Sequence, residues 1–452
     1  MNADNAQIEI NEKNTFGLIY NFASNCVRAQ NMFVQNVFGG KVENFRLKNN
    51  IKVIFNKTSG VNIVAIRIFT PVSVINETSD NAGISHLAAK LMTQSTKNRS
   101  NEILANDIEN IGADLSGDAN YDIAALSMTF LSEYFGKAAE ILADTILNPS
   151  FNEKELSFEK QNVIAALNFR KDNIGNTAYD EFTKLFYCNT SYATPVLGAK
   201  ETVSKISCED LTEWHRYSYN ASNILISIAG NIDENIVRES LEKRFAPVPI
   251  GKKFEKPVFD LKQSESIKKE IKGKFNQAYI YIGFPAPGVL DKDFVSIKVA
   301  NAILGGKMTS RLFVELREKL GLAYEIGAVY PSRKEKSYFA IYMGLDKKNI
   351  DLTLKKTDEI LKDFCTSEVD ERELENTKTY IKGLYIMSRQ TVSKQSYYYG
   401  WREIVGQGYE YDNKYLKNVE KVTMQNILDV ANKIFLRHSV GIIVNPDAKI
   451  NV

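Results

Sequence analysis

The chain has 452 residues, of which 44% are hydrophobic and 25% are charged, and its formal net charge is +2. A chain of this length has room for roughly two to four domains with large cores. Its near-zero charge excludes a global electrostatic attraction to nucleic acid or anionic lipid. Its four cysteines include no CxxC pair, which excludes a disulfide scaffold and a zinc knuckle.

The segment 1–40 is polar and rich in asparagine, and it predicts an N-terminal extension. The apolar patch Phe16–Val27 is interrupted by asparagines and has no basic segment before it, so no signal peptide is recognised. This favours a cytoplasmic over a periplasmic location. No apolar run reaches the ~18–20 residues that a membrane span needs.

Strands and helices follow one another from residue 41 onward. The pattern predicts a hairpin that turns at Asn49-Asn50, with its strands on either side. Period-2 apolar runs predict further strands, and apolar residues at helical spacing predict helices. The predicted strands cover 62–74, 121–131 and 222–233, and the predicted helices cover 82–96, 101–112, 134–148 and 152–173.

The second half of the chain repeats this order of elements. The segment Glu153–Leu156 aligns with Glu371–Leu374, which stands at the same place in the second half. The repetition indicates an internal duplication that gives two homologous α+β domains, 41–247 and 271–452, joined by a Pro/Lys/Ser-rich linker at 248–270. The repeated strands are predicted at 277–287, 337–346 and 438–446, and the repeated helices at 293–305, 349–365 and 370–386.

The predicted helix 82–96 contains the pentapeptide His86-Leu87-Ala88-Ala89-Lys90. The stretch around it, NAGISHLAAKLMTQSTKNRS, resembles the segment that carries the inverted zinc motif H-x-x-E-H in the insulinase/pitrilysin family. The resemblance implies an α+β fold with two α/β sandwich domains of the insulinase/processing-peptidase type, which is LuxS/metallohydrolase-like, and this chain would form half of a clamshell.

By this resemblance, His86 matches the first zinc ligand, Ala89 replaces the general base and Lys90 replaces the second ligand. The third ligand position is Ala166, on a helix where Glu159 matches another family glutamate. Zinc needs imidazole or carboxylate donors, and an ammonium group repels a dication. We therefore expect no metal or other cofactor in this chain, and a pair between Lys90 and Glu159 or another nearby acid.

The segment GGKMTSRLFVELREKLGLAYEIGAVY resembles the family's C-terminal signature. The resemblance implies that Arg317 and Tyr324 bind the substrate backbone and stabilise the oxyanion at a facing zinc site. A guanidinium and a phenol suit these roles, because both donate hydrogen bonds to developing negative charge. On residue type alone, Arg317 could instead be a helix-surface charge and Tyr324 a half-buried strand residue. Arg311 is expected to be structural.

The resemblance thus implies a non-catalytic, substrate-binding subunit of a heterodimeric zinc endopeptidase. The zinc would belong to a partner with an intact H-x-x-E-H motif. The role is similar to that of the alpha subunit of mitochondrial processing peptidase, but only Gly305-Gly306-Lys307 stands where that subunit has a long glycine-rich loop, which favours a bacterial-type peptidase. The alternatives are a structural scaffold, as in respiratory-complex core proteins, and a homodimeric peptide-binding protein.

Overall fold

The computed structural model describes residues 42–261 and 265–448, and these contain two β-sheets, each with helices on both faces. The predicted extension, residues 1–40, lies outside the described residues. No helix in the described part is long and apolar enough to cross a membrane.

The first sheet has the strand order β1-β2-β6-β3-β5-β4, in which β2 and β6 are parallel and the other neighbours are antiparallel. In β3 the side chains of Val64, Ile66 and Ile68 face the main core, while Arg67 and Phe69 alternate onto the opposite face. The strands are β1 Val42–Arg46, β2 Lys52–Lys57, β3 Ile63–Thr70, β4 Asp114–Ala119, β5 Ala124–Leu131 and β6 Leu225–Gly230.

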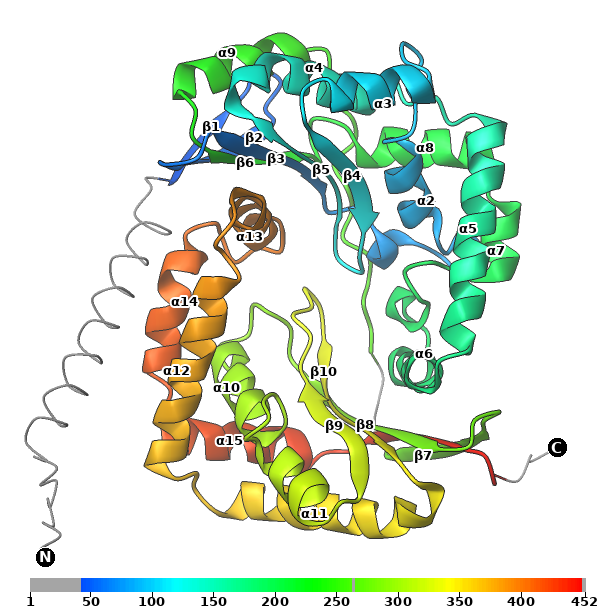
Figure 1. The fold of residues 1–452 in the computed structure, drawn as a ribbon, viewed down its shortest axis with the longest axis vertical. Helices are drawn as coiled ribbons and strands as arrows, with labels where there is room; N and C mark the ends of the chain where they lie inside the picture. Colours follow the sequence, from blue (N-terminus) through cyan, green and yellow to red (C-terminus); the bar gives the residue numbers. More distant parts are fainter. Residues whose placement is uncertain (1–41, 262–264, 449–452) are drawn as a thin grey trace, which may run out of the picture. The chain divides into compact units, whose positions relative to one another are not determined.

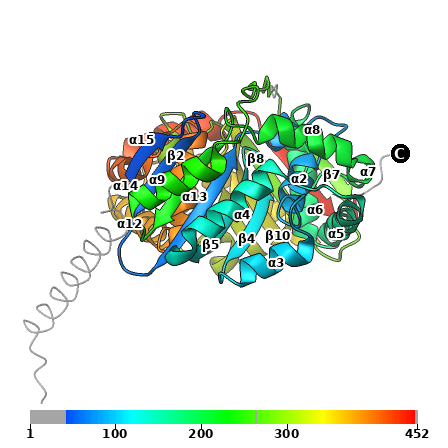
Figure 2. The same cartoon turned by 90° about the horizontal axis from the view of Figure 1, so that it is seen from above.

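The helices of the first half begin where capping residues satisfy their free amides. Asn152 accepts from the amide of Glu155, and Asn173 accepts from the amide of Asn176. Figure 2 shows α4 and α9 lying across the strands of the first sheet. The helices are α2 Ile84–Leu91, α3 Asn101–Glu109, α4 Phe135–Leu147, α5 Glu153–Lys171, α6 Ile174–Tyr187, α7 Lys200–Lys205, α8 Cys208–Ser218 and α9 Glu234–Phe245.

The second sheet repeats the first one strand for strand, apart from β1. Its order is β7-β11-β8-β10-β9, and its parallel pair, β7 with β11, corresponds to β2 with β6. The equal order confirms the internal duplication. The strands are β7 Ile267–Lys272, β8 Ala278–Ala286, β9 Ala323–Val329, β10 Ser337–Leu345 and β11 Val440–Asn445.

The helices of the second half include one unusual stretch, a π-helix over Phe313–Lys319, in which the amide of Leu320 reaches back to the carbonyl of Glu315 at 3.2 Å. The α-helices are α10 Phe294–Leu304, α11 Ile350–Thr366, α12 Glu371–Met387, α13 Val392–Ile404, α14 Tyr411–Glu420 and α15 Met424–Phe435.

Each half covers one face of the other half's sheet with a helix (Figure 1). Helix α6 of the first half packs on β8 and β11, and α13 of the second half packs on β3 and β6. Both helices follow directly on the long helices α5 and α12, so they occupy equivalent places in the two halves, as the duplication requires. Phe182 of α6 stacks on Tyr281, and Gly400 of α13 lies against Phe69.

The structure departs from the sequence predictions in the length of one strand and in several elements that were not predicted. The strand predicted over 62–74 ends at Thr70, because residues 74–76 form a short 3₁₀ turn. The elements without a counterpart among the predicted ones are the strands β4, β7 and β9 and the helices α6, α7, α8, α9, α13, α14 and α15, and β7 begins within the predicted linker 248–270. Strand β4 contains a glycine and two aspartates, which have low strand propensity, and α13 is rich in serine and tyrosine.

Candidate functional site

The helix that carries the degenerate metal motif, α2, is held at its start by a buried carboxylate. Glu77 accepts hydrogen bonds from the amides of Gly83, at 3.0 Å, and Ser85, at 2.9 Å, and so satisfies two of the free amides at the helix end. Gly83 has a φ of 99° and lies so close to the chain at Leu197 that a Cβ would be 2.8 Å from its carbonyl oxygen. Only glycine suits both conditions.

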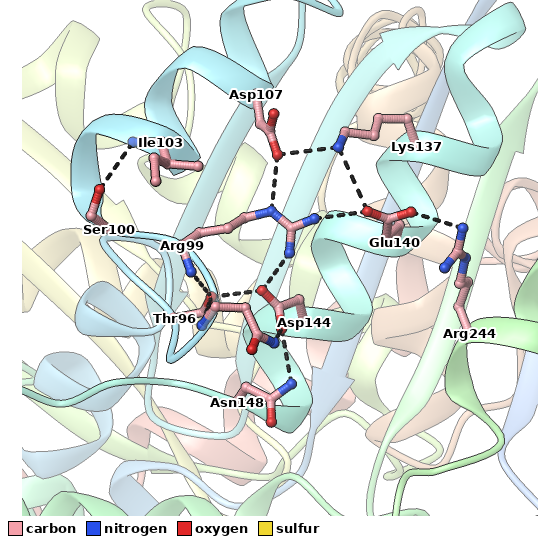
Figure 3. Close-up of polar contacts among 11 residues, drawn as sticks. Thr96, Arg99, Ser100, Ile103, Asp107, Lys137, Glu140, Asp144, Asn148 and Arg244 are labelled. Atoms are coloured by element: carbon pink, nitrogen blue, oxygen red, sulfur yellow. Dashed lines mark hydrogen bonds and ion pairs between the residues drawn. The ribbon is translucent and has the colours of Figure 1, made fainter.

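The other end of α2 leads into a loop that is fixed by Arg99 (Figure 3). The guanidinium of Arg99 contacts the carboxylates of Asp107 at 2.9 Å, Glu140 at 2.8 Å and Asp144 at 2.5 Å. Thr96 donates a further hydrogen bond to Asp144. Every acid of this cluster has a partner, so the network is structural and fixes the segment between α2 and α3.

The side chain of His86 is largely buried. Burial, followed by the positive charge of Lys90, lowers the pKa of His86 to about 4. The imidazole is therefore neutral near pH 7, as a metal ligand would be, but the neighbouring motif positions carry a methyl group and an ammonium group.

The position of the lost general base, Ala89, packs directly on the edge strand β4. A Cβ at Gly117 would lie 1.9 Å from the carbonyl oxygen of Ala89, so the backbones of helix and strand touch. Helix α2 also packs against α5, which carries Ala166. The residues that match the family's metal ligands thus lie on two helices that pack against each other, His86 and Lys90 on α2 and Ala166 on α5.

The expected pair between Lys90 and Glu159 is wrong. No ion pair joins Lys90 to Glu159 or to any other acid in the described ranges. The carboxylate of the buried Glu159 instead accepts hydrogen bonds from Gln94, at 3.3 Å, and Asn162, at 3.4 Å. The two amides satisfy Glu159 without a counter-ion.

Ala166 is exposed on α5, between two exposed phenylalanines. Phe158, two helical turns before it, is 61% exposed, and Phe169, one turn after it, is 75% exposed. These spacings place all three on one helical face. The position that holds a metal-binding glutamate in the family is therefore an exposed methyl group here, on a face that also carries two exposed phenylalanines and the amide of Asn162.

These residues do not fit a zinc ion. A catalytic zinc requires three protein donors, and only the imidazole of His86 is one. The other motif positions carry two methyl groups and an ammonium group, which cannot bind zinc. Among the described residues, no group of three or more His, Cys, Asp and Glu side chains lies close enough together to hold a metal. His215 is structural: its ring is buried and its Nε2 lies 2.9 Å from the carbonyl of Ile146.

The second motif begins with an anchored arginine. Arg311 binds Glu373 with both Nε, at 3.3 Å, and an NH2 group, at 2.8 Å, and its other NH group is 3.2 Å from Asp363. Its guanidinium also lies 5.3 Å from the ring of Phe364. Arg311 thus has the structural role expected of it, and it fixes the start of the π-helical segment.

Arg317 lies in the π-helical segment and is exposed. Its guanidinium lies 4.9 Å from the ring centroid of Phe313 and forms no ion pair with any acid in the described part of the chain. A guanidinium in this setting is permanently charged and has all of its donors available.

Tyr324 lies near the start of β9, just after Gly321, whose φ is 60°. A bulge opposite Gly344 turns Tyr324 so that its ring covers this glycine, where a Cβ would be 2.4 Å from Cζ. The ring is still 43% exposed. Burial, followed by the charge of Glu325, raises the pKa of Tyr324, so its phenol keeps its proton and can donate a hydrogen bond.

The structure brings Arg317 and Tyr324 onto neighbouring elements, because the π-helical segment packs against β9. No hydrogen bond or ion pair among the described residues joins either side chain to His86 or Lys90. The degenerate metal motif thus lies in the first half and the pair Arg317 and Tyr324 in the second half, without a direct bond between them.

A row of tyrosines beside Tyr324 belongs to neither sequence motif. Tyr279 and Tyr281 of β8 and Tyr342 of β10 share one face of the second sheet, and Tyr279 lies in hydrogen-bond contact with Glu325. Tyrosines at every second position of the segment AYIYIGF were the available signal. Tyr279 and Tyr281 are buried against α6, and the exposed Tyr324 lies at the outer end of the same face.

Comparison with known families matches both halves of the chain. Residues 52–200 match the family described as insulinase (peptidase family M16). Residues 205–381 match the family described as the peptidase M16 inactive domain.

Similar proteins occur in several bacteria. An uncharacterized zinc protease of Rickettsia felis is 29% identical over 417 residues, which cover 90% of this chain and 98% of that protein. A protein of Helicobacter pylori named non-peptidase homolog YmxG is 24% identical over 353 residues, covering 77% of this chain and 80% of the relative.

Two solved structures share the fold. A protease from Helicobacter pylori superposes with a TM-score of 0.84 at 20% identity, over 90% of this chain and 100% of the other. A peptidase M16 inactive domain from Pseudomonas fluorescens superposes with a TM-score of 0.83 at 20% identity, over 90% of this chain and 99% of the other.

Proposed function

Because the chain belongs to the peptidase M16 (insulinase) family, we propose that it is the non-catalytic, substrate-binding subunit of a two-chain zinc endopeptidase. The contrast between its two motifs carries the proposal. The metal position holds Ala89, Lys90 and Ala166, whereas Arg317 and Tyr324 are present, exposed and without charged partners among the described residues. The name non-peptidase homolog, given to a relative, supports a chain without its own hydrolytic centre.

In this proposal, the zinc and the general base belong to a partner that carries an intact H-x-x-E-H motif. Arg317 binds a backbone carbonyl of an extended peptide held at the partner's site, because its donors have no partner among the described residues. Tyr324 donates its phenolic proton in a hydrogen bond to the oxyanion that develops on the scissile carbonyl. The exposed Phe158 and Phe169 on either side of Ala166, and the partly exposed Tyr342 beside Tyr324, offer apolar contacts to the side chains of the peptide.

The test mixes this chain with a zinc-bearing H-x-x-E-H partner and measures cleavage of a fluorogenic peptide. We expect Arg317→Ala and Tyr324→Phe each to lower kcat/KM by about 10²-fold, which is typical for the loss of one oxyanion donor. Arg372→Ala and Tyr134→Phe are matched controls, because both side chains are exposed at other places. The control variants should cleave at the wild-type rate.

Other results would favour the alternative functions. Unchanged cleavage with both Arg317→Ala and Tyr324→Phe would leave a purely structural subunit. Peptide binding by the chain alone, together with no rate increase in any mixture, would favour a homodimeric peptide-binding protein. Stoichiometric zinc in the isolated chain, with chelator-sensitive cleavage, would overturn the proposal.

A further inference from the structure

A pocket of about 530 Å³ lies at the start of α10, where the loop between α13 and α14 and the helix α14 meet it. Its volume is within the usual range of small-molecule sites. It belongs to neither motif described above. The side chains that matter for its chemistry are Lys292, Ser296, Gln407, Tyr411, Asn418 and Lys421.

The rim of the pocket is cationic. Lys292 and Lys421 line it and are exposed, and neither forms an ion pair with an acid in the residues that the structure describes. The single carboxylate of the lining, Asp291, accepts a hydrogen bond from the amide of Asp293 at 2.8 Å. An anion that enters therefore meets two ammonium groups that have no ion-pair partner among the described residues, against one carboxylate.

The floor of the pocket covers further positive charge. Gln407 accepts a hydrogen bond from the buried Arg402 and donates one to the carbonyl of Val289 at 2.7 Å. The ring of Tyr411 lies 4.8 Å from the guanidinium of Arg402. Arg402 shares the carboxylate of Asp412 with Arg389, which is bound more closely, at 2.7 Å against 3.4 Å.

A lysine, Lys298, lies close to Arg402. Lys298 donates a hydrogen bond to the carbonyl of Tyr330 at 2.6 Å and lies against the rings of Phe294 and Tyr330, with no carboxylate within ion-pair distance among the described residues. Burial, followed by the charge of Arg402, lowers the pKa of Lys298 to about 7. Arg389 and Arg402 thus share the one carboxylate of Asp412 in an environment where charge is weakly screened. Lys298 adds a partial positive charge near pH 7, because its pKa is about 7.

We propose that this pocket binds a compact, multiply charged anion, a phosphate ester or a polycarboxylate. The anion offsets the excess of positive charge on the rim and beneath the floor. Ser296 and Asn418 add neutral hydrogen-bond donors, and the first turns of α10 and α15 present the positive ends of their helix dipoles.

The test titrates the full chain with pyrophosphate and, separately, with citrate, and measures heat by calorimetry. We expect saturable binding of at least one anion that weakens as salt is added. The variant Lys292→Ala/Lys421→Ala should weaken binding at least about tenfold, because the rim charges are lost. Lys243→Ala/Lys355→Ala removes the same charge from exposed positions outside the pocket and should bind as the wild type does.

Hydrogen–deuterium exchange localises the ligand independently of affinity. A bound anion should slow the amide exchange of residues 289–296 and 406–411. The exchange rates of the segment around Arg317 should stay unchanged. Binding of pyrophosphate alone would assign the phosphate class, and binding of citrate alone would assign the carboxylate class. No saturable binding at millimolar concentration, or equal weakening in the two double variants, would overturn the proposal.

Discussion

At the residue scale, the first half differs from a three-ligand metal site by two side chains. His86 is neutral near neutral pH, and α2 and α5 lie against each other. We expect Lys90→His/Ala166→Glu to bind one zinc ion, because the change removes the repelling ammonium and completes three protein donors. Metal content after dialysis and the absorption spectrum of the cobalt form are the measurements.

The single variant Lys90→His is the control for this experiment. It offers only two donors, so zinc should be lost on dialysis. A double variant that stays metal-free while keeping the wild-type circular dichroism spectrum would mean that the helices do not present these positions to one ion.

The carboxylate of Asp412 is the most heavily used buried acid of the second half. It binds Arg389 at 2.7 and 2.9 Å and accepts a hydrogen bond from Tyr385 at 2.6 Å. Burial alone would raise the pKa of Asp412, but the hydrogen bonds and charge of Arg389 outweigh it and lower the pKa below its usual 3.8. Deprotonated Asp412 therefore stabilises the fold above the pKa of the unfolded chain, and this stabilisation is lost as the pH falls through the lower, folded pKa.

We expect Asp412→Asn to lower the free energy of unfolding at pH 7 by roughly 3–5 kcal/mol, because two arginines lose their buried counter-ion. Below about pH 4 the variant should lose less additional stability than the wild type, since it lacks the titrating group. Urea unfolding at several pH values measures both effects. Asp358→Asn, which removes an exposed pair with Lys362, is the control and should change little. Parallel pH profiles of variant and wild type would contradict the prediction.

At the scale of elements, two helical glycines have opposite surroundings. A Cβ on Gly400 of α13 would lie 2.1 Å from Cε2 of the buried Phe69, whereas a Cβ on Gly383 of α12 would meet no atom within 4 Å. We expect Gly400→Ala to destabilise the protein by about 1–3 kcal/mol through overpacking. Gly383→Ala should stabilise it by about 0.5–1 kcal/mol through helix propensity. Thermal unfolding of the two variants tests the contact between α13 and the first sheet, and equal midpoints would contradict it.

The π-helical segment shows a limit of reading elements from a sequence. The stretch Phe313–Lys319 has an ordinary helical pattern of apolar residues, and nothing in it signals the longer, i to i+5 hydrogen bonds of a π-helix. The wider turn changes the direction in which each later side chain points. The sequence could therefore name Arg317 and Tyr324, but their exposure and their placement on touching elements needed the structure.

At the scale of the whole molecule, the repeated order of elements was readable because long amphipathic helices and β-branched strands carry strong periodic signals. The alignment of Glu153 with Glu371 matches the starts of α5 and α12, and the strands of the two sheets follow the same correspondence. The contacts between the two halves could not be predicted from the sequence, because α13 has no clear apolar stripe. Its partners, such as Phe69 and Asn56, lie in the opposite half of the chain.

The helices α6 and α13 have a consequence for ancestry. A single ancestral half, folded as each half is now, would leave one face of its sheet bare, because the helix that covers this face belongs to the neighbouring half. Such a protein would persist only as an intertwined pair of identical chains, each lending a helix to the other. Fusion of two such copies into one chain would make the exchange intramolecular and would leave each copy free to diverge from the other.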